Sequence, residues 1–149
     1  MKIKWWLPGL IVLLADRVVK MTLGQTACTL IPGVIALSPA RNTGMAFGLL
    51  TGNTGVVLLL SAAVIALCVF CLRGVRLRGL APVAVSMIVG GAIGNMLDRV
   101  TLGYVTDMFE LLFVHFYVFN LADVCIVAGA VLCGFSLLFR PQDWSREKK

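Results

Sequence analysis

Charged residues are scarce in this 149-residue chain: Asp, Glu, Lys and Arg together make up 13% of it. A soluble globular domain is about a quarter charged, whereas this chain is 60% hydrophobic and has a mean hydropathy of +0.98. A soluble fold is therefore excluded, and an integral membrane protein of one domain, residues 1–149, is predicted. The net charge of +6 does not require nucleic acid as a partner, because cytosolic loops collect Lys and Arg and no basic stripe with interleaved aromatics occurs.

Several kinds of catalytic site are also missing from the sequence. The chain has a single histidine, His115, with no second ligand at metal-binding spacing, so a zinc site is not expected. The patterns Ser-x-x-Lys, Gly-x-Ser-x-Gly and His-Glu-x-x-His do not occur, which argues against serine and zinc proteases. Four of the five cysteines lie in apolar stretches, where they act as small hydrophobes. No metal or cofactor is expected, and carboxylate chemistry remains.

Four apolar stretches approach the length of a membrane helix, which needs about 20 mostly apolar residues. The predicted class is an all-α membrane protein with four transmembrane helices, at about residues 5–19, 55–72, 80–97 and 121–139. Two longer segments remain, at about 20–54 and 98–120. The first has the β-branched residues and the Pro, Gly and Asn turns of short strands. The second is apolar for a loop and should lie on the bilayer surface.

Most cations lie at one set of helix ends. Nine of the thirteen Lys and Arg residues precede the first helix, fill the loop between the second and third, or follow the fourth. This bias predicts that both termini are in the cytosol and that the two long segments are extracytoplasmic. The basic and apolar start of the chain could be a secretory signal, but Asp16, Arg17 and Lys20 interrupt it, so an uncleaved helix is expected.

The few acids gather at the opposite ends. Two of the seven lie in the C-terminal tail, and the rest lie at or just beyond the predicted outer helix ends: Asp16, Asp98, Asp107, Glu110 and Asp123. Carboxylates near hydrocarbon are costly, so several at one level indicate a functional site. Two close carboxylates share a proton, and such a pair can take a proton from water and give one to a departing amine. Spacing alone leaves open which two of Asp98, Asp107 and Asp123 form the pair.

Polar residues of the first and third helices also have structural explanations. Asp16 and Lys20 have the i,i+4 spacing of a helical ion pair, and Asp98 stands next to Arg99, which suggests a second ion pair. Small and polar residues share one face of the third helix, a pattern typical of close packing between membrane helices: Gly91, Gly94, Asn95 and Asp98.

Residues near the fourth helix have structural explanations as well. Asn120 suits the N-cap, with Asp123 in the first turn facing the positive end of the helix dipole. Asp107 could be a solvated loop acid, although its neighbours are apolar. If it forms a pair with Asp123, the shared proton should lie mainly on Asp107, because the helix dipole favours the ionised form of Asp123 alone.

Five separated blocks extend over nearly the whole chain: Asp16-Arg-Val-Val-Lys20, Asn42-Thr-Gly-Met-Ala-Phe47, Gly91-Ala-Ile-Gly-Asn-Met-Leu-Asp-Arg99, Gly103-Tyr-Val-Thr-Asp-Met-Phe109 and Phe119-Asn-Leu-Ala-Asp123. In this order they resemble the blocks of bacterial lipoprotein signal peptidases, also called signal peptidase II. Any one block is weak, but five in order are highly specific. Three places depart from the family pattern: Arg17 stands where Gln is usual, Tyr117 where Pro is frequent, and Val124-Cys125 where small hydroxyl residues are common.

The resemblance implies an aspartyl membrane protease that removes the signal peptide from prolipoproteins, just before a Cys already carrying diacylglycerol. It implies that Asp107 and Asp123 are catalytic. It also implies substrate-binding or supporting roles for a further set: Asn42, Asn95, Arg99, Asn120, Asp16, Lys20 and Asp98. A small β-cradle from residues 20–54 and a surface helix near residues 108–116 are expected on the same basis.

The resemblance further implies a place in the bacterial cytoplasmic (inner) membrane, with the site at the extracytoplasmic face. The expected partners are the lipid-modified prolipoprotein, membrane lipid and a globomycin-type inhibitor. Three alternative functions fit the sequence less well. A proton-coupled transporter or channel subunit would place acids at mid-membrane depth, and here the helix middles have none. A presenilin-type protease needs a Gly-x-Gly-Asp motif, which is absent. A non-catalytic assembly factor would fail to cleave a lipidated precursor.

Overall fold

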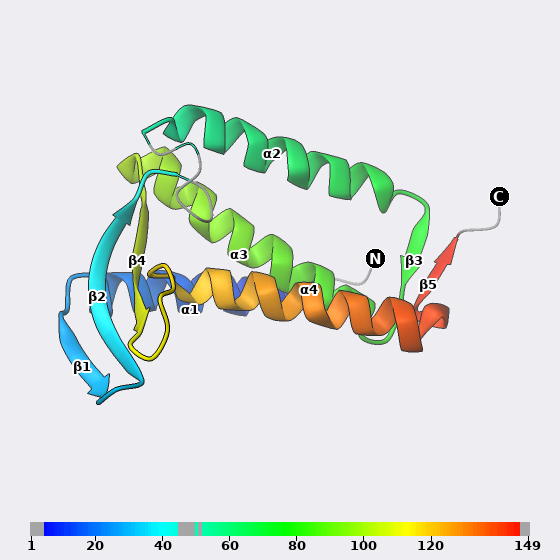
Figure 1. Cartoon of the computed structure of the whole chain (residues 1–149). Coiled ribbons are helices and arrows are strands. Elements are labelled where there is room, and N and C mark those ends of the chain that lie inside the picture. The colour runs from blue at the N-terminus through cyan, green and yellow to red at the C-terminus, as the bar shows by residue number, and fades with distance from the viewer. Residues whose placement is uncertain (1–4, 45–49, 51, 147–149) are drawn as a thin grey trace.

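The computed structural model describes residues 5–44, 50 and 52–146. Within them lie four long helices, as predicted: α1 (Leu7–Leu23), α2 (Thr54–Cys71), α3 (Ala81–Leu102) and α4 (Leu121–Phe139) (Figure 1). In the described part of the chain α2, α3 and α4 are long and apolar enough to cross a membrane. The fourth, α1, has 17 residues and continues past the predicted end through the charged residues after Ala15.

Small residues let α3 pack closely against both α1 and α4. A Cβ atom added to Gly90 would lie 2.2 Å from the backbone oxygen of Gly9 in α1, and one added to Gly91 would lie 2.7 Å from that of Ala122 in α4. Gly94 likewise faces the carboxylate of Asp16. The predicted packing role of the α3 glycines is therefore confirmed, and this contact holds three helices together at the level of their polar residues.

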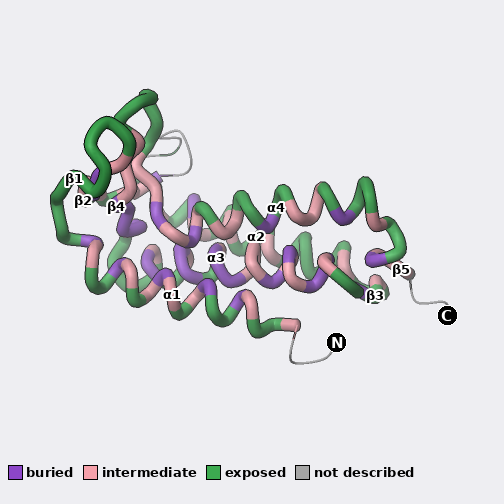
Figure 2. The backbone as a smooth tube through the Cα atoms, turned by 90° about the horizontal axis from the view of Figure 1, so that it is seen from below, coloured by how far each residue is buried: buried purple, intermediate pink, exposed green. Residues whose placement is uncertain are grey.

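The helix α2 lies apart from this three-helix group. Its one buried residue is Val57, and its apolar side chains cover most of the rest of its surface. Figure 2 shows α2 mostly exposed, whereas buried residues follow α3 and gather where α1, α4 and the strands meet. An apolar helix with so little protein around it is suited to contact with lipid.

A three-stranded antiparallel sheet lies at one end of the helices, with the order β1-β2-β4: β1 (Cys28–Ile31), β2 (Ile35–Asn42) and β4 (Val105–Leu111) (Figure 1). The strands expected in residues 20–54 are confirmed. The surface helix expected near residues 108–116 is wrong. That stretch begins as β4, whose backbone hydrogen-bonds to β2 on one side and to Phe119 on the other. These bonds satisfy the backbone N–H and C=O groups that would bond within the segment if it were a helix.

The chain reaches β4 through a sharp turn at the end of α3. Gly103 has φ +81°, in the left-handed region that glycine adopts without strain, and it ends the helix. The turn directs residues 105–111 back across the ends of α1 and α4. Asp107 is thereby brought against the first turn of α4. That turn contains Asp123, which follows Asp107 by sixteen residues in the sequence.

A second, two-stranded sheet closes the opposite end. It joins β3, in the loop between α2 and α3, to the C-terminal β5, which follows a short 3-10 turn, η3: β3 (Val75–Leu77), η3 (Pro141–Asp143) and β5 (Trp144–Arg146). The buried carboxylate of Asp143 accepts hydrogen bonds from the Leu80 amide (3.0 Å) and the Ser136 hydroxyl (3.4 Å). The end of α4 is therefore fastened to the start of α3.

Candidate active site

Two acids from distant parts of the sequence, Asp107 and Asp123, meet at the sheet end of the helices. Asn120 contacts both of them. Its side-chain Nδ2 donates to Oδ1 of Asp107 at 2.6 Å, and its backbone amide donates to Oδ2 of Asp123 at 3.2 Å. Its Oδ1 accepts from the amide of Asp123 at 2.9 Å. One residue therefore fixes the position of one carboxyl group relative to the other.

The local sequence explains this arrangement around Asn120. Asn120 is the N-cap of α4 and Asp123 is the third residue of the helix, so each side chain bonds the backbone amide of the other. This reciprocal capping satisfies two amides that have no partner within the helix. The predicted cap is confirmed. It also leaves the Nδ2 of Asn120 directed away from the helix, toward Asp107.

Two further asparagines complete the hydrogen bonding of the acids. Asn42, the last residue of β2, donates through Nδ2 to Oδ2 of Asp107 at 3.0 Å. Asn95 of α3 donates through Nδ2 to Oδ1 of Asp123 at 2.8 Å. Among the described residues, each carboxyl group thus accepts two hydrogen bonds, and four elements, β2, α3, β4 and α4, supply these groups.

Asp107 lies in an environment that favours its protonated form. Its side chain is 1% exposed, so the interpretation as a solvated loop acid is wrong. Burial, and next the negative charge of Asp123, raise the pKa of Asp107 from an ordinary 3.8 to about 6. Hydrogen bonds from Asn42 and Asn120 and the charge of Lys20 oppose this rise only in part. Asp107 therefore gains a proton within the range of pH in which enzymes work.

Behind the pair lies a buried ion network centred on Lys20. Its ammonium nitrogen is 2.9 Å from Oδ2 of Asp16, 2.9 Å from Oδ2 of Asp98 and 2.9 Å from Oδ1 of Asn95. The predicted Asp16–Lys20 ion pair is confirmed. Because Asn95 also bonds Asp123, one amide side chain joins the lysine to the carboxyl pair.

The predicted ion pair between Asp98 and Arg99 is wrong. Asp98 pairs with Lys20 and Arg17 of α1, since adjacent residues on a helix point in different directions. Arg99 instead donates to two backbone oxygens, that of Gly44 at 2.9 Å and that of Asn95 at 3.4 Å. It thus braces the chain at Gly44. Residues 45–49, which include the last three residues of the second sequence block, lie outside the described residues.

The two acids of the network also bond the backbone beside the pair. Oδ1 of Asp16 accepts from the amide of Ala122 at 3.0 Å, and Oδ2 of Asp98 accepts from the amide of Thr106 at 3.2 Å. Ala122 precedes Asp123, and Thr106 precedes Asp107. These contacts and that of Arg17 were not expected from the sequence, because no local pattern indicates a partner on another element.

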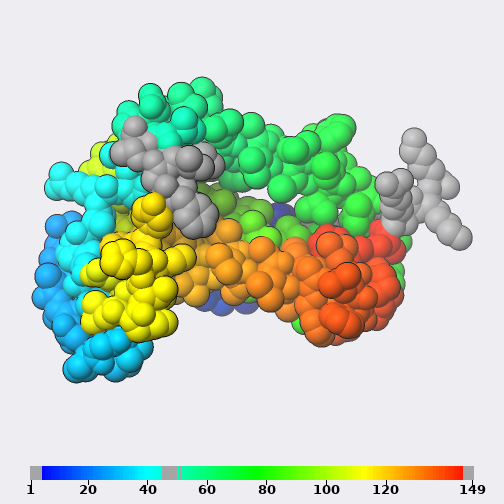
Figure 3. Space-filling model, in the orientation of Figure 1, coloured from blue at the N-terminus to red at the C-terminus, as the bar shows by residue number. Residues whose placement is uncertain are grey.

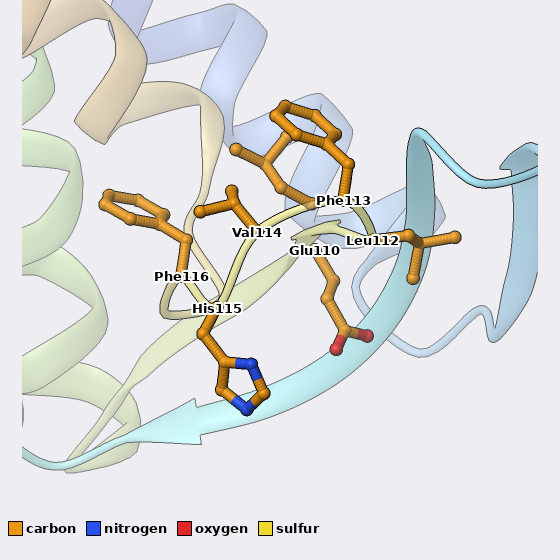
Figure 4. A pocket seen from close by; sticks show the side chains of 7 residues that line it. Glu110, Leu112, Phe113, Val114, His115 and Phe116 are labelled. Carbon is orange, nitrogen blue, oxygen red and sulfur yellow. The ribbon is translucent and has the colours of Figure 1, made fainter.

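The end of β4 and the loop that follows it line an open pocket of about 270 Å³, formed by residues 110–116. Glu110 and His115 point to the same side of this loop, whereas Phe113 and Phe116 lie on its other side (Figure 4). Figure 3 shows the loop (yellow) at the surface, next to the first turns of α4. His115 thus lines a pocket outside the carboxyl pair and its network.

A carboxyl pair held at one end of a group of apolar helices defines a membrane enzyme. The same architecture occurs in two solved structures described as bacterial membrane enzymes. One has a TM-score of 0.78 at 26% identity and covers 98% of this chain and 93% of its own; the other has 0.75 at 27% and covers 92% and 94%.

The family is given by sequence. Residues 9–139 match the family described as Signal peptidase (SPase) II, and the chain belongs to that family of membrane proteases. It is 34% identical to the lipoprotein signal peptidase of Lactobacillus johnsonii, over 88% of this chain and 89% of the relative. It is 37% identical to that of Lactiplantibacillus plantarum, over 89% and 91%.

Proposed function

We propose that this chain is an aspartyl endopeptidase that removes the signal peptide from diacylglyceryl-modified prolipoproteins, cutting before the lipidated Cys. The observation that carries the proposal is the bridge through Asn120, which holds Asp107 and Asp123 beside each other. Family membership and the names of the relatives support the substrate class. No cofactor and no metal ion is assigned a role.

The proposed chemistry divides two tasks between the acids. Asp123, as a carboxylate, accepts a proton from water while the water oxygen bonds to the scissile carbonyl carbon. Asp107 starts protonated, in keeping with its raised pKa of about 6, and gives its proton to the amine nitrogen as the C–N bond breaks. One proton transfer from Asp123 then restores the starting state. The titration belongs to the pair, with the proton mainly on Asp107 in the free enzyme.

The supporting residues have distinct tasks in this proposal. Asn42, Asn95 and Asn120 fix the carboxyl oxygens through their hydrogen bonds. Arg99 braces the site by donating to the backbone oxygens of Gly44 and Asn95. The ion network supports them from behind: Asp16, Lys20 and Asp98.

The proposed placement puts four helices across the bacterial inner membrane, with both termini in the cytoplasm and the site at the extracytoplasmic face. The described cations after α2 and α4 lie at the end opposite the carboxyl pair, which supports this orientation: Arg73, Arg76, Arg78 and Arg140. The substrate lipid can then stay in the bilayer while the peptide bond meets water. Phe113, 67% exposed, and its apolar neighbours are suited to lipid, and a globomycin-type inhibitor would bind at the same end.

Cleavage of a purified diacylglyceryl-modified precursor tests the proposal. Asp107→Asn and Asp123→Asn should each lose nearly all activity, whereas the matched control Glu110→Gln should remain active, because Glu110 bonds Ser38 and lies outside the pair. The same precursor without lipid should not be cut. Circular dichroism checks that each variant is folded. Full activity of either aspartate variant would remove that residue from the mechanism.

A further inference from the structure

Arg17 is the most exposed of the four charged residues in the network behind the site. Its side chain is 29% exposed, whereas those of its three partners are almost completely buried: Asp16, Lys20 and Asp98. Its Nη2 contacts Oδ1 of Asp98 at 2.5 Å, lies 3.5 Å from Oδ2 of Asp16, and donates to the Gly94 backbone oxygen at 3.5 Å. Arg17 therefore joins α1 to α3 at the edge of the network.

The charges of this network balance only when Arg17 is counted. Asp16 and Asp98 carry two negative charges, and Lys20 supplies one positive charge between them. Arg17 supplies the second. Without it, one net negative charge would remain in a buried region that touches the site through Asn95 and through the amides beside both aspartates.

We propose that Arg17 is a positioning residue that sets the pH range of cleavage, by neutralising Asp98 and so keeping excess negative charge away from the carboxyl pair. The inference rests on the proposed function. Three elements supply the charged groups around the pair: Asp16, Arg17 and Lys20 of α1, Asp98 and Arg99 of α3, and Arg41 of β2. The guanidinium of Arg41 lies 5.0 Å from the centre of the Tyr104 ring.

The expected effect has a sign and a size. A pair that works with one proton loses its base at low pH and its acid at high pH, which gives a bell-shaped profile. Arg17→Gln leaves one net negative charge in the network that Asn95 joins to the pair, so both limbs should move up by about 0.5–1 pH unit. Asp98→Asn removes a negative charge and should move both limbs down by a similar amount. The double variant restores the balance and should return both limbs toward their wild-type positions.

The test is the pH profile of kcat/KM for a diacylglyceryl-modified precursor. Arg17→Lys should keep the wild-type profile, and so should Arg73→Gln, which removes a positive charge beside Phe70 at the far end of α2. A purely structural role of Arg17 would lower the thermal stability and the rate but leave both limbs in place. Thermal unfolding identifies any variant that fails to fold, and Asp98→Asn and the double variant then carry the test.

The outcomes separate this inference from the proposed function. If the wild type does not cleave the precursor, the proposed function fails. If the wild type cleaves with a bell-shaped profile but Arg17→Gln leaves the limbs unmoved, the assignment of Arg17 fails and the proposed function stands. A shift of Arg17→Gln and Asp98→Asn in the same direction would also overturn the assignment, because net charge predicts opposite shifts.

Discussion

Replacing Asp107 with asparagine should abolish cleavage and, at the same time, make the folded protein more stable at pH values well above 6, where Asp107 has lost its proton. The reason is the cost of keeping a negative charge on a carboxyl group that is 1% exposed and next to Asp123. An asparagine of almost the same shape removes that charge. A carboxyl group whose loss stabilises the fold would fit the catalytic role proposed for Asp107, because such an acid is kept for chemistry and not for stability.

The magnitude follows from the raised pKa of Asp107. A rise from 3.8 to about 6 corresponds to a penalty of about 3 kcal/mol for the ionised form. Asparagine cannot accept hydrogen bonds from both Asn42 and Asn120, and the lost bond lowers the free energy of unfolding by about 1–1.5 kcal/mol. The net gain in the free energy of unfolding should be about 1–2 kcal/mol at a pH well above 6.

The pH dependence has a definite sign. The folded pKa lies above the unfolded one, so the folded wild type takes up the proton first and becomes more stable as the pH falls through 6. Between about pH 7.5 and pH 5 this gain is about 1.4 kcal/mol, and it is absent from Asp107→Asn. The difference in the free energy of unfolding between Asp107→Asn and the wild type should therefore be largest at high pH and decrease toward pH 5.

Reversible unfolding in detergent micelles, followed by circular dichroism at several pH values, measures the difference. Glu110→Gln serves as the control, since it makes the same chemical change at a carboxylate that bonds Ser38 and not the pair. The reasoning is refuted if Asp107→Asn is less stable than the wild type by an amount that does not change with pH. That result would mean that the two hydrogen bonds to Asp107 outweigh the cost of its charge.

Lys20→Met should lower the free energy of unfolding by about 3–5 kcal/mol, because two buried carboxylates lose their shared cation; denaturation that matches the wild type would contradict this. Gly90→Ala should strongly lower the Tm, since the new Cβ would lie 2.2 Å from the Gly9 oxygen, whereas Gly134→Ala meets no atom within 4 Å and should be neutral or stabilising. Equal Tm values would contradict the close helix contact. Asp143→Ala should cost about 1–3 kcal/mol by leaving its donors unpaired, and a wild-type Tm would count against its role as a fastening point.

The helices were largely predictable, because their signals are local. The predicted ranges 55–72 and 121–139 differ from α2 and α4 by at most one residue, since each is one long apolar run that polar or turn-forming residues bound. The ends of α1 and α3 were set too early. Both helices continue through charged residues, and these are stable there only because each helix supplies ion-pair partners for the other.

The site was predictable only where its contacts are short in sequence. The cap of α4 and the Asp16–Lys20 pair follow from spacings of three and four residues. The partner of Asp98 lies 81 residues earlier, at Arg17, so no local spacing indicates it, and the local sequence favours the adjacent Arg99. The strand β4 was missed for the same reason, because the backbone groups that define it belong to β2, on the far side of α2 and α3 in the sequence.

The fastening of α4 at the end opposite the site has a consequence for catalysis. Ser136 lies thirteen residues after Asp123, about 20 Å along the helix axis, and it bonds both Asp143 and the indole nitrogen of Trp144. A helix that is held at its C-terminal end cannot slide or rotate without displacing the residues at its N-terminal end, and in α4 these include Asp123. If the proposed function holds, we therefore expect that a tag, antibody or small molecule bound to the C-terminal strand changes the turnover number while the groups at the carboxyl pair stay chemically the same.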